Sequence, residues 1–295
     1  MTDETAVAES PDVPEITSGS MLAFRFTLRG RRVVRDGVET YDAFGDAGFG
    51  DVVVRLVRPE LAGRDGGLLA LRLADQVENL RVLTHPGFPR LVADGWDEPL
   101  GVRFLALEPT VGDTLETRLS RGRKLGVPEA LRLADALCEV VGFLHDHGQL
   151  HLGLSPERVV LCPDGAAFPI KVQGTGRYRA GESPAPPGPG EFDLGYLAPE
   201  RLRGEPCDVR SDVHGLGAVL YRILGGHAPF RGATAPEVLA ARGRGAAPLF
   251  AAGASSGAEV DRAARKCLAD DPTRRYANVA ELRKELAALR PKVGT

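Results

Sequence analysis

Apolar and polar residues alternate through the first third of the chain, in short stretches bounded by glycine or proline. The alternation is clearest in Phe24–Leu28, Val38–Phe44 and Val52–Val57. A period of two over four to eight residues is typical of half-buried strands. We therefore predict a small antiparallel sheet between Met21 and Leu107.

One helix is predicted inside this β-rich region. Its apolar residues recur every three or four positions and would line one face, and the His-Pro-Gly sequence at 85–87 would end it. The apolar positions are Leu69, Leu73, Val77 (or its neighbour Gln76), Leu80 and Leu83.

Helical periodicity dominates from about Pro109 onward. It is clearest in Val127–His147, Asp212–Gly225 and Val279–Leu289. The segment Gly181–Gly190 contains four prolines, so it can form neither a helix nor a central strand and is predicted to be an exposed loop. The chain as a whole is predicted to be α+β.

The first 20 residues differ in composition from the rest. They contain five acidic residues and no basic residue. They also carry too few apolar groups to offset the entropy lost on ordering. We predict a disordered acidic tail over residues 1–20.

The composition of the 295 residues excludes several classes of protein. The net charge of −3 does not favour nucleic acid, and no apolar run approaches the roughly 18 residues of a membrane span. The N-terminus lacks the features of a secretory signal, so we expect a cytoplasmic protein. The cysteines are far apart in sequence, which predicts buried free thiols and neither a zinc site nor disulfides. They are Cys138, Cys162, Cys207 and Cys267.

Four motifs occur in a fixed order in the second half of the chain. They are His151–Leu161, Tyr196–Glu200, Ser211–Gly217 and Asp271–Tyr276. They resemble four motifs of Ser/Thr protein kinases, those of bacteria above all. These are the catalytic loop, the Ala-Pro-Glu segment, the start of the buried central helix and the last-helix arginine motif.

The resemblance extends upstream and covers about residues 22–290. Val52–Leu61 resembles the Val-Ala-Val-Lys strand of bacterial kinases, and Phe104–Glu108 resembles the strand before the hinge. It implies a bilobal, protein-kinase-like fold. The N-lobe at 21–108 would hold a small antiparallel sheet and one helix, and the larger C-lobe at 109–291 would be mainly helical.

The resemblance fails where phosphoryl transfer needs specific side chains. Kinases use a catalytic-loop Asp to orient the substrate hydroxyl, and an Asn and a second Asp to hold magnesium. The catalytic loop also carries a Lys in this family. The matching positions, which we read as degenerate catalytic positions, are Gly153, Ser155, Arg158 and Gly174.

The catalytic lysine of the small lobe is also missing. The first lysine of the chain is Lys124, and the only asparagines are Asn79 and Asn278, neither near the catalytic loop in sequence. No shift of register restores these groups. The Lys position best matches Arg55, since Gln76 then stands near the position of the paired Glu.

Two alternatives to this pairing remain. Glu78 could pair with Arg55 after a small rotation of the helix. A rival register places Arg72 at the Lys position, but almost no helix would then separate it from Gln76. We prefer the register with Arg55.

The resemblance implies a vestigial nucleotide pocket. Val53 stands where the family has Ala, and its extra methyl groups would lie beneath a purine. Gly45, Gly48 and Gly50 look like a phosphate loop, but they lie where a hairpin turn belongs. The preferred register puts the phosphate loop at Val33–Val38. The implied pocket residues are Val53, Arg55, Gln76, Leu107, Glu108, Thr110 and Val160.

The features that remain are structural. Glu200 and Arg275 resemble the buried ion pair of the family, and Asp212 resembles the Asp that caps the catalytic-loop backbone. His151 keeps its place in the catalytic-loop frame. Leu152 replaces the Arg that would receive an activation-loop phosphate.

Some polar residues near these motifs have no assigned role. Asp193 stands where the family has a Thr beside the substrate, and Thr175 and Ser183 are read as ordinary loop residues. His145 and His147, together with the family-explained His151, could suggest a metal cluster, but no metal is expected.

We therefore predict a pseudokinase that works as a scaffold or allosteric protein by binding a protein partner, without a cofactor. Two alternatives are a sensor that binds ATP without magnesium and an active atypical Ser/Thr kinase that uses Glu157, Asp164 or Asp193. Neither nucleic acid nor a membrane is an expected partner. Candidate binding surfaces are the acidic tail, the Pro-rich loop, and the outer face of the helix at 64–84.

Overall fold

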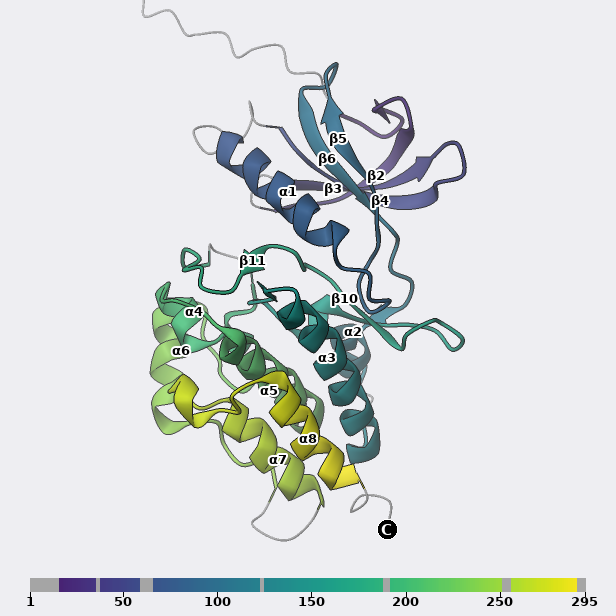
Figure 1. Cartoon of the computed structure of the whole chain (residues 1–295). Coiled ribbons are helices and arrows are strands. Elements are labelled where there is room, and N and C mark those ends of the chain that lie inside the picture. Colours follow the sequence, from purple (N-terminus) through teal and green to yellow (C-terminus); the bar gives the residue numbers. More distant parts are fainter. Residues whose placement is uncertain are drawn as a thin grey trace, which may run out of the picture. The chain divides into compact units, whose positions relative to one another are not determined.

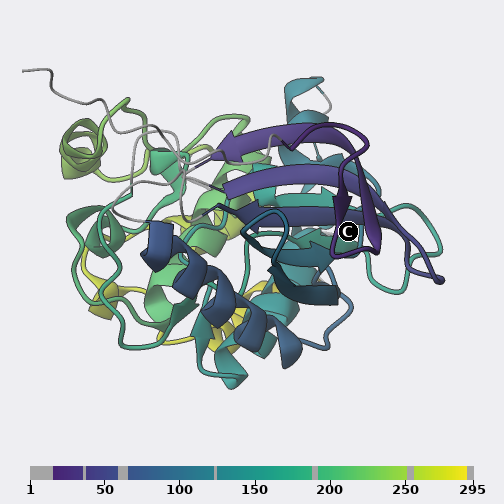
Figure 2. The same cartoon turned by 90° about the horizontal axis from the view of Figure 1, so that it is seen from above.

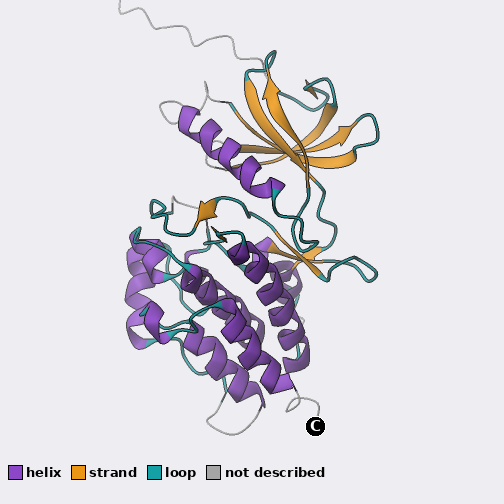
Figure 3. Cartoon of the chain, in the orientation of Figure 1, coloured by secondary structure: helices purple, strands orange, loops and turns teal. Residues whose placement is uncertain are grey.

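The computed structural model describes residues 16–35, 38–58, 66–122, 125–187, 192–250 and 256–290. These residues form two compact units. The smaller unit contains the described residues up to Val77 and Leu91–Pro109, and the larger unit contains Glu78–Arg90 and the described residues from Thr110 onward. Strands gather in the smaller unit and helices in the larger one (Figure 3). The predicted α+β class is confirmed.

A curled antiparallel sheet of six strands makes up most of the smaller unit (Figures 1 and 2). The strand order is β1-β2-β3-β4-β6-β5. The strands are β1 (Met21–Leu22), β2 (Phe26–Arg35), β3 (Val38–Gly45), β4 (Gly50–Val57), β5 (Leu91–Asp97) and β6 (Val102–Leu107). The three stretches that alternate in sequence all contribute to this sheet.

The alternation places every second side chain on a buried face. Phe26, Leu28, Val52 and Val54 lie in one apolar cluster of this unit. Ile16, which falls within the predicted tail, is buried in the same cluster, so the prediction of disorder is corrected at this residue. Residues 1–15 lie outside the described part of the chain.

The helix predicted before the His-Pro-Gly sequence is α1 (Gly66–Arg81), which lies beside the sheet in both views (Figures 1 and 2). Leu73, Val77 and Leu80 are buried, as the spacing predicts. Arg64, where the predicted outer face of this helix began, lies outside the described residues.

Helices form most of the larger unit. The three helices expected from periodicity are present, with boundaries within a few residues of the prediction. The helices are α2 (Leu115–Ser120), α3 (Val127–Asp146), α4 (Pro199–Arg203), α5 (Val209–Gly225), α6 (Ala235–Ala241), α7 (Ser256–Cys267) and α8 (Val279–Leu289).

Short strands and 3-10 turns connect these helices and carry the motif segments. The short strands pair as β9 with both β7 and β10, and β8 with β11. They are β7 (Asp113–Thr114), β8 (Gln149–Leu150), β9 (Val159–Leu161), β10 (Ile170–Val172) and β11 (Tyr178–Arg179). The 3-10 turns used below are η2 (Pro156–Arg158) and η3 (Leu194–Tyr196).

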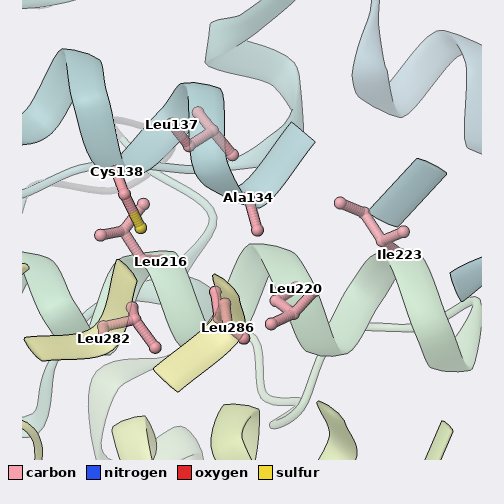
Figure 4. A pocket seen from close by; sticks show the side chains of 8 residues that line it. All are labelled: Ala134, Leu137, Cys138, Leu216, Leu220, Ile223, Leu282 and Leu286. Carbon is pink, nitrogen blue, oxygen red and sulfur yellow. The ribbon is translucent and has the colours of Figure 1, made fainter. Parts of the chain in front are cut away.

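The core of the larger unit lies where α3, α5 and α8 meet. Figure 4 shows apolar side chains from the three helices around a cavity of about 10 Å³. Helix α5 starts with a capping box in which Asp208 and Ser211 bond each other's backbone amides. That cap fixes the start of the central helix, which carries Asp212 in its first turn.

The Pro-rich segment is a loop without helix or strand over its described residues, Gly181–Pro187, and most of these are exposed, as predicted. However, its backbone is held by the larger unit. Arg201 donates to the Ala185 carbonyl, and Cys207 N donates to Glu182 O at 3.4 Å. Residues 188–190 lie outside the described part.

The structure also bears on the predictions made for the cysteines and for membrane spans. The four cysteines are free, and three of them are buried. Cys162 is only half-buried, so its predicted burial was wrong. Among the described residues, no helix has the length and apolar character that crossing a bilayer requires.

Candidate functional site

The smaller unit brings Arg55 and Gln76 together, as the preferred register predicts. Arg55 in β4 donates from Nη1 to Oε1 of Gln76 in α1 at 3.2 Å. A bond from a cation to a neutral amide takes the place of the Lys-Glu ion pair of active kinases. Arg72 is an exposed residue of α1 and not of a strand, which excludes the rival register. Glu78 pairs with Arg81 at 2.8 Å and not with Arg55.

Strand β4 places Val53 opposite Leu107 of β6. Val53 and Arg55 are half-buried, whereas Val52 and Val54 lie in the core. Successive strand residues point to opposite faces, so Val53 and Arg55 share the face away from that core. Glu108 directly follows β6.

The glycine-rich segment is a hairpin turn, as predicted. Gly45 pairs with Gly50 at the end of the β3-β4 ladder, and Gly48 lies in the turn between them. The predicted phosphate loop, Val33–Val38, falls on the β2-β3 hairpin, where Arg35 pairs with Val38. Its turn residues and the side chains of Val33 and Arg35 lie outside the described part.

In the larger unit, Asp212 holds the backbone of the degenerate catalytic loop. Its carboxylate accepts hydrogen bonds from His151 N at 2.8 Å and Leu152 N at 2.7 Å, and from His145 Nε2 at 2.9 Å. Burial opposes ionisation, but the hydrogen bonds from His145 and His151 and their favourable electrostatic interactions together outweigh it and hold the pKa of Asp212 below its ordinary value. The predicted cap is present.

His151 is fully enclosed and neutral. Its Nε2 donates to Gln173 O at 3.1 Å, and its Nδ1 accepts from Gly153 N at 3.3 Å. Burial lowers the pKa of His151 to about 4. The next residue, Leu152, lies in a small apolar cluster with Leu150 and Cys207, so it contributes packing and no phosphate receptor.

Phe192 occupies the space where a side chain at Gly153 would lie. A methyl group built on Gly153 would overlap the edge of the Phe192 ring. Protein interiors are close-packed, so a carboxylate cannot fit at this position unless Phe192 moves. The position of the catalytic Asp is therefore filled by an apolar ring.

Arg158 occupies the corresponding space at Gly174. A methyl group built on Gly174 would overlap Nη1 of Arg158, and Gly174 has a φ of +83° that side chains rarely adopt. Magnesium requires oxygen ligands, and here a guanidinium lies where the family places two oxygen ligands. The residues present do not fit a magnesium ion.

Phe192 is part of a stack of arginine and aromatic side chains that the sequence did not reveal. The guanidinium carbons of Arg158 and Arg201 lie 4.8 Å and 5.6 Å from the centre of its ring. Arg201 also lies 5.5 Å from the ring centre of Tyr178 in β11. These residues come from separate segments, and no local spacing connects them.

The predicted ion pair of Glu200 and Arg275 is present and buried. Arg275 donates from Nη1 and Nη2 to the two carboxylate oxygens, at 2.7 and 2.9 Å. Ser211 Oγ donates to Glu200 Oε1 at 2.7 Å. Despite desolvation, these bonds hold the pKa of Glu200 below its ordinary value.

Asn79 lies close to the catalytic-loop hairpin, contrary to what its sequence position suggested. Its Nδ2 donates to Gly176 O at 2.9 Å, and its Oδ1 accepts from Arg179 Nη2 at 2.9 Å. Its carbonyl accepts from Gln149 Nε2 at 3.1 Å. Both atoms of the amide are occupied, so Asn79 links the last turn of α1 to the segment after Gly174.

The remaining predicted pocket residues of the larger unit are Thr110 and Val160. Thr110 Oγ1 accepts from Gln173 Nε2 at 2.5 Å. Val160 is buried in β9, opposite Thr114 of β7. Ser155, just before η2, is buried and lines a polar cavity.

The remaining polar residues have local roles. Thr175 is buried, whereas Ser183 is exposed. His147 bonds Phe143 O, apart from the partners of His145 and His151. Within the described ranges, no group of three or more His, Cys, Asp or Glu side chains could hold a metal ion.

Comparison with known proteins finds bacterial serine/threonine-protein kinases as relatives. The chain is 32% identical over 243 residues to the serine/threonine-protein kinase PknB of Mycolicibacterium smegmatis. It is 29% identical over 260 residues to the probable serine/threonine-protein kinase SCO3848 of Streptomyces coelicolor. These matches cover 80% and 85% of this chain but only 38% and 37% of those relatives.

The fold matches a solved structure over most of the chain. The crystal structure of the Mycobacterium tuberculosis PknI kinase domain superposes with a TM-score of 0.66 at 20% identity, covering 93% of this chain and all of that one. This confirms the bilobal kinase-like fold. The family pattern described as the protein kinase domain matches residues 83–285, more than half of the chain. The chain therefore belongs to the protein kinase domain family.

Proposed function

We propose that this kinase domain is catalytically inactive and works by binding a protein partner. The observation that carries the proposal is the filling of the two carboxylate positions by the chain's own side chains. Phe192 covers Gly153, and Arg158 covers Gly174. If the two carboxylates were only absent, carboxylates from elsewhere in the chain could enter the space. Here Phe192 and Arg158 already occupy it.

The charge at the metal position supports the same proposal. Phosphoryl transfer needs magnesium to neutralise charge that develops between the β- and γ-phosphates. Arg158 carries a fixed positive charge, which repels a divalent cation. Its ring contact with Phe192 holds it there.

The supports of the fold are intact, which favours a binding role over a damaged domain. Asp212 caps the catalytic loop, and the Glu200-Arg275 pair is fully hydrogen-bonded. Removing one partner of a buried pair costs about 3 to 5 kcal/mol. A chain that keeps these groups while it lacks the catalytic ones retains a stable surface on which partners can bind.

A phosphotransfer assay tests the proposal. We expect no incorporation of labelled phosphate into the chain itself or into generic protein substrates, with ATP and either magnesium or manganese. The reason is that no carboxylate is available at either position. The baseline is a heat-inactivated sample of the same protein.

The opposing candidate is an active atypical Ser/Thr kinase, as the names of the relatives suggest. It would incorporate label above the heat-inactivated baseline, and Arg55→Ala would remove that signal. Glu285→Gln, an exposed substitution on α8, is the matched control for effects of handling. Incorporation that depends on Arg55 would overturn the proposal.

A further inference from the structure

The Pro-rich loop follows β11 in the larger unit and carries three prolines within residues 184–187. Ser183, Ala185 and Pro186 are exposed, and Pro184 and Pro187 are half-buried. These residues therefore offer solvent a short surface of proline rings and small side chains.

The sequence restrains the backbone at every residue of this stretch. A proline ring holds its own φ at about −65°, and the residue before a proline is pushed into extended conformations. One of these restraints, or both, acts on each residue from Ser183 to Pro187. In the structure none of these residues has a positive φ or belongs to a helix or strand. The stretch is therefore restrained toward polyproline II, an extended helix with three residues per turn and no internal hydrogen bonds.

Contacts with α4 hold this stretch in place. Arg201 of α4 donates from Nη1 to the Ala185 carbonyl. The Pro186 ring lies against Gly204, the residue that ends α4, where an added methyl group would come 3.0 Å from the Cδ of that ring. The segment is thus extended by its own sequence and anchored by the fold.

The anchoring side chain is itself fixed. Arg201 is only 2% exposed, and its guanidinium carbon lies 5.5 Å and 5.6 Å from the ring centres of Tyr178 and Phe192. Its Nη2 donates to the Tyr178 hydroxyl at 3.4 Å. An arginine held in this way has few rotamers left, so the carbonyl that it binds is held as well. A partner that binds such a segment orders little that is not already ordered.

The spacing of the prolines determines which edges a partner can reach. Residues three apart lie on one edge of a polyproline II helix. Ser183 and Pro186 share an exposed edge, and Pro184 and Pro187 share a half-exposed one. The Ala185 carbonyl is already bound by the anchor. The accessible edges thus present the spacing Pro-x-x-Pro, and segments of this kind bind in grooves lined by aromatic side chains.

A charge lies at one end of the segment. Glu182, directly before Ser183, is exposed. A groove that receives the prolines would meet this carboxylate at its edge, so a basic residue there would be complementary.

We propose that residues 183–187 form an anchored docking site for a protein domain whose groove is lined by aromatic rings and bordered by a basic residue. The inference rests on the proposed binding function, and it names the surface used and the kind of partner. The two proline rings at 184 and 187 enter neighbouring pockets between the aromatic rings. The anchor at α4 keeps the segment extended before the partner arrives.

Titration of the full chain into isotope-labelled SH3, WW and EVH1 domains tests this assignment. All three domains recognise polyproline II segments through aromatic-lined grooves. We expect chemical-shift changes in the aromatic groove of at least one of them by nuclear magnetic resonance. Absence of changes in all three at about 0.5 mM chain, a concentration that detects even weak binding, would overturn the proposal.

Matched double variants locate the site on this chain. Pro184→Ala with Pro187→Ala should weaken binding at least about 10-fold, because both ring contacts and two backbone restraints are lost. Pro163→Ala with Pro248→Ala replaces two exposed prolines elsewhere in the larger unit and should leave binding unchanged. Circular dichroism checks that each variant is folded.

Glu182→Gln tests the charge at the edge of the groove. It should weaken binding about 2- to 5-fold, as expected for an exposed ion pair. Tighter or unchanged binding would show that the partner's groove has no basic residue at this end and would overturn that part of the assignment.

A free peptide with the sequence of residues 181–187 tests the anchoring. It should bind the same domain at least about 5-fold more weakly than the full chain, because the peptide must lose conformations that the anchored loop has already lost. Equal affinity would show that the anchor contributes nothing to binding.

Two further results would overturn the docking site. Equal binding by the Pro184→Ala and Pro187→Ala double variant, or shift changes confined to another surface of the probe domain, would place the contact elsewhere. The phosphotransfer assay does not depend on these prolines. Failure of docking therefore leaves the proposed loss of activity in place, whereas phosphate incorporation would contradict the proposed function alone.

Discussion

At the scale of single residues, specific neighbours fill two of the positions that resemble catalytic positions of the family. Glycine at 153 and 174 gives no side chain, and Phe192 and Arg158 take the space. Ser155 differs because nothing fills the volume next to it, and a cavity remains. Close packing is the usual outcome in protein interiors, and both glycine positions show it.

Buried neutral histidines predict how stability depends on pH. The folded pKa of His151 is about 4, below the unfolded value of about 6.5. Between pH 6.5 and pH 4 the unfolded chain therefore binds a proton at His151 that the folded chain does not bind. The stability that the neutral imidazole contributes is complete above pH 6.5 and is lost as the pH falls toward 4. His151→Gln should reduce the loss of unfolding free energy between pH 7.5 and pH 5 by about 2 kcal/mol.

Urea unfolding at the two pH values measures this effect. His147→Gln, which changes an exposed histidine, is the control and should retain the full loss seen in the parent. His214 is also enclosed, and burial and Arg242 lower its pKa, so some loss should persist in His151→Gln. If His151→Gln loses as much stability as the parent, the neutral buried state of His151 is wrong.

At the scale of elements, packing between helices sets the framework that holds the site. Helix α5 presents Asp212 to the catalytic loop, and Leu216 and Leu220, one and two turns further along the helix, meet α3 and α8. Arg201 of α4, only 2% exposed, binds the Pro-rich segment and stacks on Phe192. The Pro-rich loop is thus exposed on its outer side while its backbone is anchored to α4. A partner that binds this loop would find it in few conformations.

The helix core gives a stability prediction. Leu216 of α5 is 4% exposed and lines the cavity between α3, α5 and α8. Leu216→Ala would enlarge that cavity and should reduce the unfolding free energy by about 2 to 5 kcal/mol. Val111→Ala, at a residue 68% exposed, is the control in the same unit and should change it by less than about 0.5 kcal/mol.

Urea denaturation monitored by circular dichroism compares the two variants. The size of the difference is informative, because both substitutions shorten an apolar side chain to alanine. Similar losses in the two variants would show that the three-helix core does not control the stability of the larger unit.

At the scale of the whole molecule, the residues of the family's nucleotide site are divided between the two units. Arg55 and Gln76 belong to the smaller unit, and Arg158 and Gly174 belong to the larger one. Neither pair can hold a metal ion, because no carboxylate is present in either. Neither pair would give a nucleotide a metal-bridged contact, so we expect direct contacts from the arginines in its place.

This division predicts that magnesium has no effect on nucleotide binding. A ligand that binds the folded state raises the melting temperature according to its concentration and affinity. We expect any shift caused by ATP to be the same with magnesium and with a chelator. A larger shift with magnesium would contradict the loss of the metal site, and Arg158→Ala would then show whether the arginine takes part.

The sequence alone determined the family, four of the helices and the residue types at the positions that resemble the family's catalytic ones. Periodicity predicted α1, α3, α5 and α8 because one buried face repeats every three or four residues. The missing Lys, Asp and Asn could be recognised without coordinates, because folding cannot supply a side chain that the chain lacks. The Arg55-Gln76 pair also followed from spacing, since the strand and helix have fixed lengths.

Only the tertiary structure decided what the vacated positions became. Phe192 reaches Gly153 from 39 residues away in sequence, and Asn79 reaches Gly176 from 97 residues away. Each of these contacts has at least one partner in a loop without periodicity, so no local pattern encodes it. Their geometry depends on how the helices and strands place the loop backbones. For the same reason, the filled space at Gly174 and the open space at Ser155 could not be distinguished until the chain was folded.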